Sequence, residues 1–352
     1  MGKRILFITH QLSKTGAPIV LLDVIRCCKK KGNEILVMSM AEGELRKDLE
    51  DMGIPVLLRE HFLEDYEVFL KQAEEFDFVF ANTLITFEAI HALKYSSLPV
   101  VWWLHEGKQY FEYFTKVLPD FSSLLPQIHV YAVSGYVQDA LQELYGYKAP
   151  LLPIGIEDEY AAGEKKQEGL LKFVVSGTYS RLKGQDILAA AVQQLPLNCQ
   201  SKFELEFYGD LKIREEEVFS SVRDLAGQYH NVSIMPFVSH EEMLKKIAQA
   251  DCMIIPSRVD PLPTVAVEAM MQHVPCICSN VCGVARQLQD GRDGLLFESE
   301  NIKDLAEKIE YVLKHPGILP QLGEAAREIY EKNYAYQIFE KNVGHIFDTH
   351  KV

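Results

Sequence analysis

Short apolar segments alternate with amphipathic, helix-like segments along the whole chain. The segments typical of strands are residues 4–9, 34–39, 56–58, 76–81, 100–104, 129–133 and 151–154, followed by 171–176, 203–208, 232–235, 252–255, 275–279 and 294–297. Helical patterns separate most of them, as at 18–31, 43–52 and 84–95. Strands that alternate with helices in this way predict parallel βαβ units, and therefore an α/β fold with doubly wound sheets.

The polar and weakly patterned segment 157–169 divides this series in two. The chain has 352 residues, more than the size at which one core keeps growing. We therefore predict two consecutive Rossmann-like domains, the first at 1–162 and the second at 163–333. The last segment, 321–352, is helical in pattern and leads into no further strand.

The composition excludes some classes of protein. A net charge of −14 argues against a general nucleic-acid-binding protein, which needs a basic face to neutralise phosphates. Lysines 29–31 form a local basic group, but three lysines that end a helix are usually solvated. The chain shows no signal peptide and no apolar run near the ~20 residues that a membrane helix needs. We expect a cytoplasmic protein.

The seven cysteines allow two interpretations. Cys276, Cys278 and Cys282 lie close enough in sequence to suggest a metal site. However, Cys276 and Cys278 alternate within an apolar strand, as small core residues do, and no histidine cluster accompanies them. Buried free thiols are the interpretation that we adopt.

The segment from residue 252 to residue 270 carries the most information about function. An apolar strand at 252–255 is followed by a proline-rich turn that ends at Pro263, and a helix begins near Thr264. The first backbone N–H groups of that helix, at Thr264 and Val265, lack partners within the helix and favour an anion such as a diphosphate. Asp260 precedes the helix and Glu268 lies one turn into it, so both could reach hydroxyl groups of one ligand. The alternative is a solvated loop aspartate and a surface glutamate.

The two acids at this spacing resemble the retaining glycosyltransferases of family 4, in which a Glu, seven residues and a second Glu follow one another. Asp260 replaces the first Glu in this chain. In that family the first acid contacts the transferred sugar and the second contacts the nucleotide ribose. The resemblance implies the GT-B fold, with two Rossmann-like domains facing a cleft and a C-terminal helix, here 334–352, that crosses back onto the N-terminal domain.

A second loop, after the predicted strand 171–176, resembles the same family. Gly177 is followed six residues later by Lys183 and then by a glycine. The resemblance places the Lys183 ammonium on the donor diphosphate. Many members carry an Arg directly after the first Gly, whereas this chain has Thr178 there and Arg181 three residues on, so we assign the second cation to Arg181. A solvated basic pair is the alternative.

The N-terminal half resembles the family at two residues. Gly16 lies in the loop between the first strand and the first helix, which lacks the G-x-G-x-x-G pattern of nicotinamide-binding domains. A plain turn glycine is its alternative, and the resemblance favours a contact with the donor phosphates. His105 directly follows the strand 100–104 and two tryptophans. It could be a structural histidine, while the resemblance implies contact with the transferred sugar.

Two further segments have open assignments. In the family, the turn that corresponds to Phe237 and Val238 lines the nucleobase pocket through its backbone. Phe237 could equally be a core aromatic. The aromatic-rich segment 110–125 could line an acceptor groove, touch a membrane or form a packed helix.

Taken together, the motifs predict a retaining glycosyltransferase that moves a sugar from a nucleotide-diphosphate sugar to an acceptor hydroxyl. The expected catalytic residues are His105, Lys183, Asp260 and Glu268. The expected donor-binding residues are Gly16, Gly177, Arg181, Lys183, Phe237, Val238, Pro263, Thr264, Val265 and Glu268. Because no Asp-x-Asp motif is present, cations and helix dipoles would take the place of a metal ion.

The resemblance leaves partners and pathway less defined. We expect no cofactor and a UDP-linked donor, although no residue identifies the base. The acceptor would be a glycan or a lipid-linked or protein-linked group in cell-envelope or exopolysaccharide synthesis, with peripheral contact at the inner face of the membrane left open. A sugar-nucleotide epimerase and a non-catalytic binding partner of a glycosyltransferase are the competing hypotheses.

Overall fold

The computed structural model describes residues 2–14, 16–94, 96–117, 124, 128–160 and 169–350. Its contacts divide the chain into two compact units. The N-terminal unit comprises Met1–Gly155 and Tyr336–Val352, and the C-terminal unit comprises Ile156–Ala335. The domain boundary that we predicted at 162/163 lies outside the described residues.

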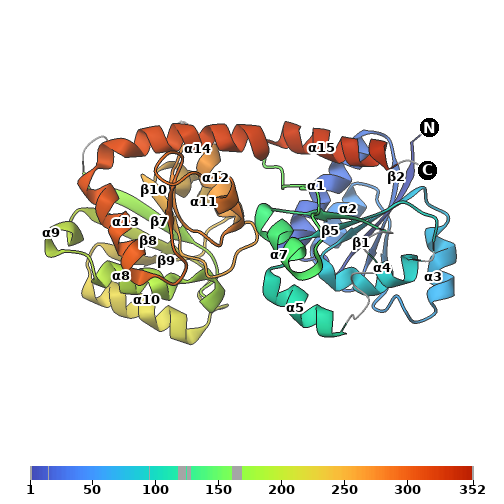
Figure 1. The fold of residues 1–352 in the computed structure, drawn as a ribbon, viewed down its shortest axis with the longest axis horizontal. Helices are drawn as coiled ribbons and strands as arrows, with labels where there is room; N and C mark the ends of the chain where they lie inside the picture. The colour runs from blue at the N-terminus through green and yellow to red at the C-terminus, as the bar shows by residue number, and fades with distance from the viewer. Residues whose placement is uncertain are drawn as a thin grey trace. The chain divides into compact units, whose positions relative to one another are not determined.

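The N-terminal unit contains a six-stranded sheet in the order β3-β2-β1-β4-β5-β6, and all of its pairings are parallel. Its strands are β1 (Arg4–Thr9), β2 (Glu34–Ser39), β3 (Val56–Leu58), β4 (Phe78–Asn82), β5 (Val100–Leu104) and β6 (His129–Ala132). The central strands β4 and β5 are buried at every residue, as expected when helices cover both faces of a parallel sheet (Figure 1).

Helices follow the strands of this unit one after another along the chain. They are α1 (Gly16–Lys30), α2 (Leu45–Asp51), α3 (Tyr66–Ala73), η1 (Leu84–Thr86), α4 (Phe87–Leu93), α5 (Lys108–Val117) and α7 (Gly135–Tyr145). Within the predicted segment 110–125, α5 buries Phe111 and exposes Tyr110 and Tyr113, and residues 118–123 and 125–127 lie outside the described residues.

The predicted strand at 151–154 is wrong. Only one bridge, between Ala132 and Leu151, forms there. The reason is that β6 ends at Ala132, and the chain then turns into α7, whose first turn is capped by the Ser134 side chain. Residues beyond Leu152 therefore have no neighbouring strand with which to pair.

The C-terminal helix α15 (Tyr336–Thr349) packs on the N-terminal unit. It buries Phe339 and Phe347, and the Phe347 ring lies 4.6 Å from that of Phe78 between centroids. The Lys3 ammonium donates to the Phe347 carbonyl at 2.8 Å. Apolar burial against β4 and β5 and along α1, beside which α15 lies in Figure 1, thus attaches the end of the chain to its beginning.

Two stacked imidazoles connect the end of α15 to the sheet. The rings of His129, in β6, and His350 lie 3.6 Å apart at an interplanar angle of 20°. The Tyr131 hydroxyl lies 3.0 Å from His350 Nε2. Burial, with the neighbouring His129 and His345, lowers the pKa of His350 to about 4, and burial also lowers the pKa of His129.

Acid should weaken this attachment. Because unfolded His350 titrates near 6.5 and the folded group near 4, the unfolded chain binds an extra proton between these values, and stability falls as the pH falls through that window. His350→Phe keeps a ring in the stack and removes the proton. Its thermal unfolding midpoint should therefore drop less than the wild-type midpoint between about pH 7 and about pH 4. His230→Phe, at an exposed turn, should follow the wild type. Equal acid sensitivity of wild type and His350→Phe would contradict this prediction.

The C-terminal unit contains a second all-parallel sheet, in the order β12-β11-β10-β7-β8-β9. Its strands are β7 (Leu171–Ser176), β8 (Phe203–Tyr208), β9 (Val232–Met235), β10 (Cys252–Ile255), β11 (Cys276–Ser279) and β12 (Leu295–Phe297). Its helices are η2 (Arg181–Lys183), α8 (Gln185–Gln193), α9 (Leu197–Gln200), α10 (Glu216–Gln228), α11 (His240–Ala248), α12 (Thr264–Met271), η3 (Gly283–Arg286), α13 (Ile302–Lys314), η4 (Pro316–Ile318) and α14 (Leu319–Asn333).

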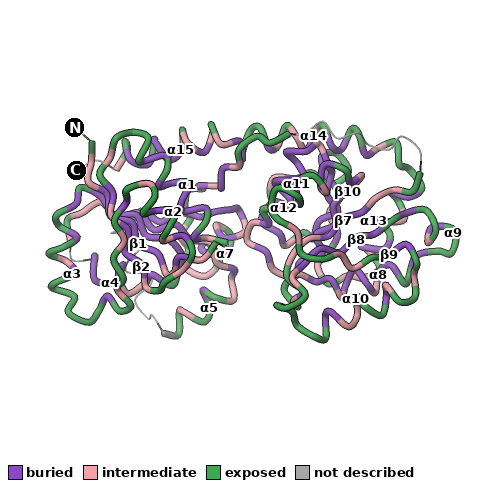
Figure 2. The backbone as a smooth tube through the Cα atoms, turned by 180° about the vertical axis from the view of Figure 1, so that it is seen from behind, coloured by how far each residue is buried: buried purple, intermediate pink, exposed green. Residues whose placement is uncertain are grey.

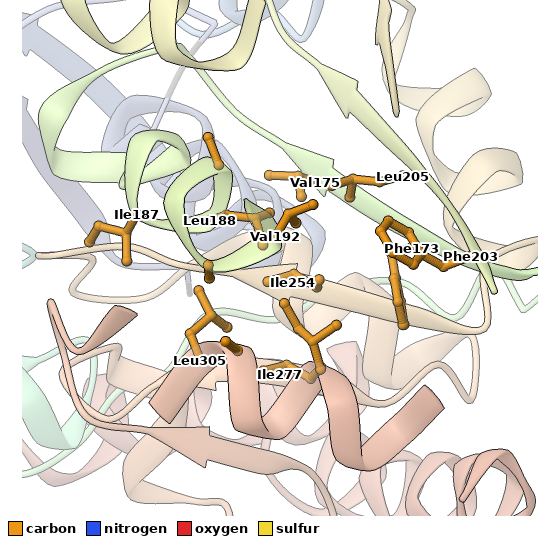
Figure 3. Packing of buried hydrophobic residues seen from close by; sticks show 14 of the residues in the cluster. Phe173, Val175, Ile187, Leu188, Val192, Phe203, Leu205, Ile254, Ile277 and Leu305 are labelled. Atoms are coloured by element: carbon orange, nitrogen blue, oxygen red, sulfur yellow. The ribbon is translucent and has the colours of Figure 1, made fainter. Parts of the chain in front are cut away.

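One core cluster of this unit lies between the sheet and the helices on one of its faces. Phe173, Leu205 and Ile254 project from the strands, and Leu188 of α8 and Leu305 of α13 pack against them (Figure 3). In both units the central strands are buried and the outer helix faces are exposed (Figure 2). Rossmann-like sheets of this kind hold their strand ends in fixed positions, which is what a ligand site at those ends requires.

Two other features limit the chemistry. All seven cysteines are buried and free, as we predicted, and burial raises the pKa of the Cys276 thiol well above its usual range. Across the described part of the chain, no helix is both long and apolar enough to span a membrane.

Candidate functional site

Two loops meet at the switch point of the C-terminal sheet, where the strand order reverses between β7 and β10. One loop leaves β7 and contains η2, and the other leaves β10 and leads into α12. The Arg258 N–H donates to the Leu182 carbonyl at 2.8 Å, and a Cβ on Gly184 would lie 2.0 Å from the Pro256 carbonyl oxygen. The loops at such a switch point leave the carboxyl ends of neighbouring strands, and in an open α/β sheet they form the usual ligand site.

Lys183 and Asp260, one from each loop, form an ion pair. Lys183 Nζ lies 2.5 Å from Asp260 Oδ2. The aspartate is only 7% exposed, and its backbone carbonyl accepts the Gly283 N–H at 2.9 Å. The lysine side chain is partly exposed. The pair therefore places a fixed carboxylate and an accessible ammonium next to each other.

The start of α12 offers backbone N–H groups beside this pair. Its N-cap is Pro263, which provides no side-chain cap, and its first turn contains no acidic residue. Thr264 is exposed and Val265 is half-buried. Helix α12 begins at Thr264 as we predicted, and the uncapped amides together with the helix dipole favour an anion.

Glu268 is buried one turn into α12, with 5% of its surface exposed. Its Oε1 lies 3.0 Å from His240 Nε2, at the start of α11. Its Oε2 is also buried and has no hydrogen-bond partner among the described residues. A surface position, the alternative that the sequence left open, is therefore wrong, and so is a solvated Asp260.

Arg258 is a site residue that the sequence analysis missed. Its guanidinium makes a bidentate pair with Asp186 at 2.8 Å, reaches Glu300 at 2.9 Å and donates to the Arg181 carbonyl at 2.8 Å. The hydrogen bond to Asp186 raises the pKa of Arg258 above its usual range. Planar bidentate pairing of this kind fixes geometry, so Arg258 holds the β10 loop against η2 and α8.

The other predicted donor-binding residues of this unit lie in the β7 loop and in the turn between β9 and α11. Gly177 has a φ of 149° and its carbonyl accepts from Gln185 Nε2 at 3.4 Å. Arg181 is exposed, and its backbone N–H donates to Glu215 at 2.9 Å. Phe237, in the turn between β9 and α11, is 71% exposed, which excludes the core role that we left open. Val238 beside it is half-buried.

The N-terminal unit holds Gly16 and His105 at the edge where β1, β4 and β5 end. Gly16 begins α1 with a φ of 52°, in the left-handed region that favours glycine. The carbonyl of the next residue, Ala17, accepts from the Asn82 side chain at 2.9 Å. Gly16 therefore lies at the switch point between β1 and β4.

His105 is half-buried, and its Nε2 has no hydrogen-bond partner among the described residues. Burial, with a smaller effect of His10, lowers its pKa to about 3, so the imidazole is neutral at physiological pH. The ring lies 4.3 Å from that of Trp103 between centroids. An unpartnered neutral imidazole nitrogen can accept a hydrogen bond from a ligand hydroxyl.

Two residues that follow the ends of β5 and β4, Glu106 and Thr83, were also missed. The Glu106 carboxylate accepts the His105 N–H at 2.9 Å and the Leu84 N–H at 2.8 Å, and burial raises the pKa of Glu106 to about 7. The Thr83 hydroxyl oxygen lies 3.0 Å from His10 Nδ1. Thr83 also has a φ of 75°, which is a strained conformation for a β-branched residue. Backbone strain of this kind often marks functional sites.

The structure thus brings seven predicted residues together at one edge of the C-terminal sheet. They are Gly177, Arg181, Lys183, Asp260, Pro263, Thr264 and Val265. Glu268 lies one turn further along α12, and Phe237 and Val238 lie at the end of β9. Gly16 and His105 belong to the N-terminal unit.

Comparison with known proteins identifies the family. Residues 157–329 match the family described as "Glycosyl transferases group 1", and residues 1–151 match "Glycosyl-transferase family 4". The chain belongs to glycosyltransferase family 4. The two matches meet where the two units meet, so each unit carries its own family signature.

Similar curated sequences are named as glycosyltransferases. An uncharacterised glycosyltransferase of Methanocaldococcus jannaschii is 26% identical over 220 residues, which cover 62% of this chain and 59% of that protein. The D-inositol 3-phosphate glycosyltransferase of Arthrobacter sp. is 24% identical over 193 residues, covering 52% of this chain and 46% of that protein. The matched segments therefore span less than two thirds of these relatives.

Solved structures of similar proteins share the fold. Anabaena HepE in complex with UDP superposes with a TM-score of 0.83 at 19% identity, covering 98% of this chain and 100% of that one. A glycosyltransferase from Rickettsia africae gives a TM-score of 0.81 at 16% identity, with 99% of each chain covered. The predicted GT-B fold is confirmed.

Proposed function

We propose that this protein is a glycosyltransferase that moves a sugar from a nucleotide-diphosphate sugar to an acceptor hydroxyl. The observation that carries the proposal is the Lys183–Asp260 pair beside the uncapped start of α12, at the switch point of the C-terminal sheet. An ammonium and free backbone amides suit a diphosphate, and buried carboxylates suit sugar and ribose hydroxyls. Membership in family 4 supports the same assignment.

The proposed chemistry is electrostatic. As the glycosidic bond breaks, negative charge grows on the departing nucleoside diphosphate. Lys183 and the amides of Thr264 and Val265 would stabilise that charge, with Arg181 as the second cation. Because Asp260 holds Lys183 in place before the donor arrives, the ammonium needs little reorganisation.

The two acids and His105 would bind hydroxyl groups. We assign Asp260 to the transferred sugar and Glu268 to the ribose. His105 would accept a hydrogen bond from the sugar through its unpartnered Nε2, and Gly16 would contact the donor phosphates. Transfer would retain the anomeric configuration, with the acceptor attacking the face from which the leaving phosphate departs.

The donor is proposed to be a UDP-sugar, because solved structures of the similar HepE contain UDP and UDP-glucose. The acceptor would be a glycan, lipid-linked or protein-linked group in cell-envelope or exopolysaccharide synthesis in the cytoplasm. A relative in Bacillus subtilis named as a putative teichuronic acid biosynthesis glycosyltransferase, 27% identical over 216 residues, supports that context.

A panel of UDP-, GDP- and ADP-linked sugars tests the proposal. We expect one donor class to raise the thermal unfolding midpoint, because a ligand that binds only the folded state stabilises it, by about 2.7 kcal/mol at 100 times its Kd. The same donor should be hydrolysed slowly or transferred, and NMR of the product should show a retained anomeric configuration. Failure of every donor to stabilise the protein would overturn the proposal, and an epimerised free donor would replace it with an epimerase.

A further inference from the structure

His240 makes a contact that the proposed function does not use. It begins α11, and its side chain is 68% exposed, so burial in the core does not explain its position. Its Nε2 reaches 3.0 Å from Oε1 of the buried Glu268. Among the described residues, this is the side-chain hydrogen bond that the structure shows for the Glu268 carboxylate. It joins the start of α11 to the interior of α12.

The two oxygens of Glu268 therefore differ. Oε1 is held by His240, whereas Oε2 is buried with no hydrogen-bond partner among the described residues. A buried carboxylate oxygen without a donor is costly, and the cost disappears when a ligand hydroxyl donates to it. Rotation about the last side-chain torsion would exchange the two oxygens of a free carboxylate. The hydrogen bond between His240 and Oε1 selects one of the two orientations.

The charges around His240 favour this role. The hydrogen bond to Glu268 raises the pKa of His240 against the opposing effect of partial burial, and Glu159 adds to the rise. Glu241 and Glu242 lie on its own helix, and the Glu241 side chain pairs with Lys245. The imidazole thus contacts Glu268 of α12 and also feels the negative charge of Glu159, which precedes β7 in the chain. A protonated imidazole makes a stronger, charge-assisted bond to the carboxylate.

We propose that His240 is a positioning residue for the ribose of the donor, holding Glu268 through Oε1 so that Oε2 is presented to a ribose hydroxyl. The inference rests on the proposed function, because it names the residue that orients the ribose-binding acid. It predicts that His240 contributes to binding affinity only for nucleotides that carry ribose hydroxyls.

The test compares UDP with 2′,3′-dideoxyuridine diphosphate by calorimetric titration of the full chain. His240→Ala should weaken UDP about tenfold, the effect of losing one well-oriented hydrogen bond to a charged group, and should leave the dideoxy compound unchanged. His240→Gln retains an N–H donor and should recover most of the UDP affinity. A general loss of structure would instead weaken both nucleotides and would not be recovered by glutamine.

His273→Asn is the matched control. His273 also contacts a glutamate of the same unit, with Nδ1 3.0 Å from Glu324 Oε1, and its φ of 56° is one that asparagine tolerates. This variant should bind both nucleotides as the wild type does. Equal effects of His240→Ala on UDP and on the dideoxy compound, or no effect on either, overturn the inference alone. A wild-type protein that binds neither UDP, GDP nor ADP overturns the proposed function and the inference with it.

Discussion

Replacing Lys183 with methionine is expected to lower turnover of the donor by roughly 10²–10³-fold, the usual effect of removing one preorganised group that stabilises transition-state charge. Methionine keeps most of the side-chain volume and removes the ammonium. The loss should appear mainly in kcat, because the charge on the diphosphate grows as the bond to the sugar breaks. Steady-state kinetics with the donor selected by the panel measures both constants.

The variant also leaves Asp260 without its partner. Since Asp260 is 7% exposed, an unpaired carboxylate there should lower the unfolding midpoint. Lys183→Met combined with Asp260→Asn removes that charge and should regain stability without regaining activity. Lys245→Met deletes an exposed lysine that pairs with Glu241, and should leave turnover unchanged. Near wild-type rates for Lys183→Met in a folded protein would remove Lys183 from the site.

Much of the fold could be predicted because several strands, β4, β5, β10 and β11 among them, are buried on both faces. Strands such as Val100–Leu104 and Cys252–Ile255 appear in the sequence as apolar runs between helical patterns, and the structure places them at those residues. The segment 151–154 is equally apolar but is not a strand. Its neighbour β6 ends at Ala132, and the end of a neighbouring strand cannot be seen in the local pattern.

The candidate site could be predicted where its residues are close in sequence. Asp260, Thr264 and Glu268 lie on one strand-turn-helix segment, so their spacing alone indicates a shared edge of the sheet. Contacts between distant segments could not be predicted in this way. The bonds of Arg258 to Asp186 and of His240 to Glu268 join different βα units, and neither residue belongs to a motif with a known spacing.

Exposure decided some assignments that sequence left open. The aromatic Phe237 fits a core or a ligand-facing turn equally well by type, and its 71% exposure excludes the core. Glu268 fits a helix surface by type, yet α12 is buried along most of its length and takes Glu268 inside. In both cases the local pattern identified the element, and the packing of the whole unit determined which way the side chain faces.

Gly184→Ala should be the most damaging small substitution in the C-terminal unit. Gly184 has a φ of 69°, which costs about 1–2 kcal/mol in any other L-residue, and its added Cβ would lie 2.0 Å from the Pro256 carbonyl oxygen. The β7 and β10 loops would have to move apart. We expect a total loss of about 3 kcal/mol, since overpacking typically costs ~1–3 kcal/mol, and therefore a midpoint lowered by roughly 6–12 °C for a unit of this size.

Gly291→Ala separates the two causes. Gly291 lies in the same unit with a φ of 78°, but its Cβ would meet nothing within 4 Å. That variant should therefore lose only the backbone term, about 1–2 kcal/mol, and should keep donor binding. Gly184→Ala should lose donor binding as well, because Lys183 precedes it directly and depends on the same loop contact for its position beside Asp260. If both alanine variants unfolded at the same midpoint and bound donor equally, the close approach of Pro256 to Gly184 would not be what holds the two loops of the site together.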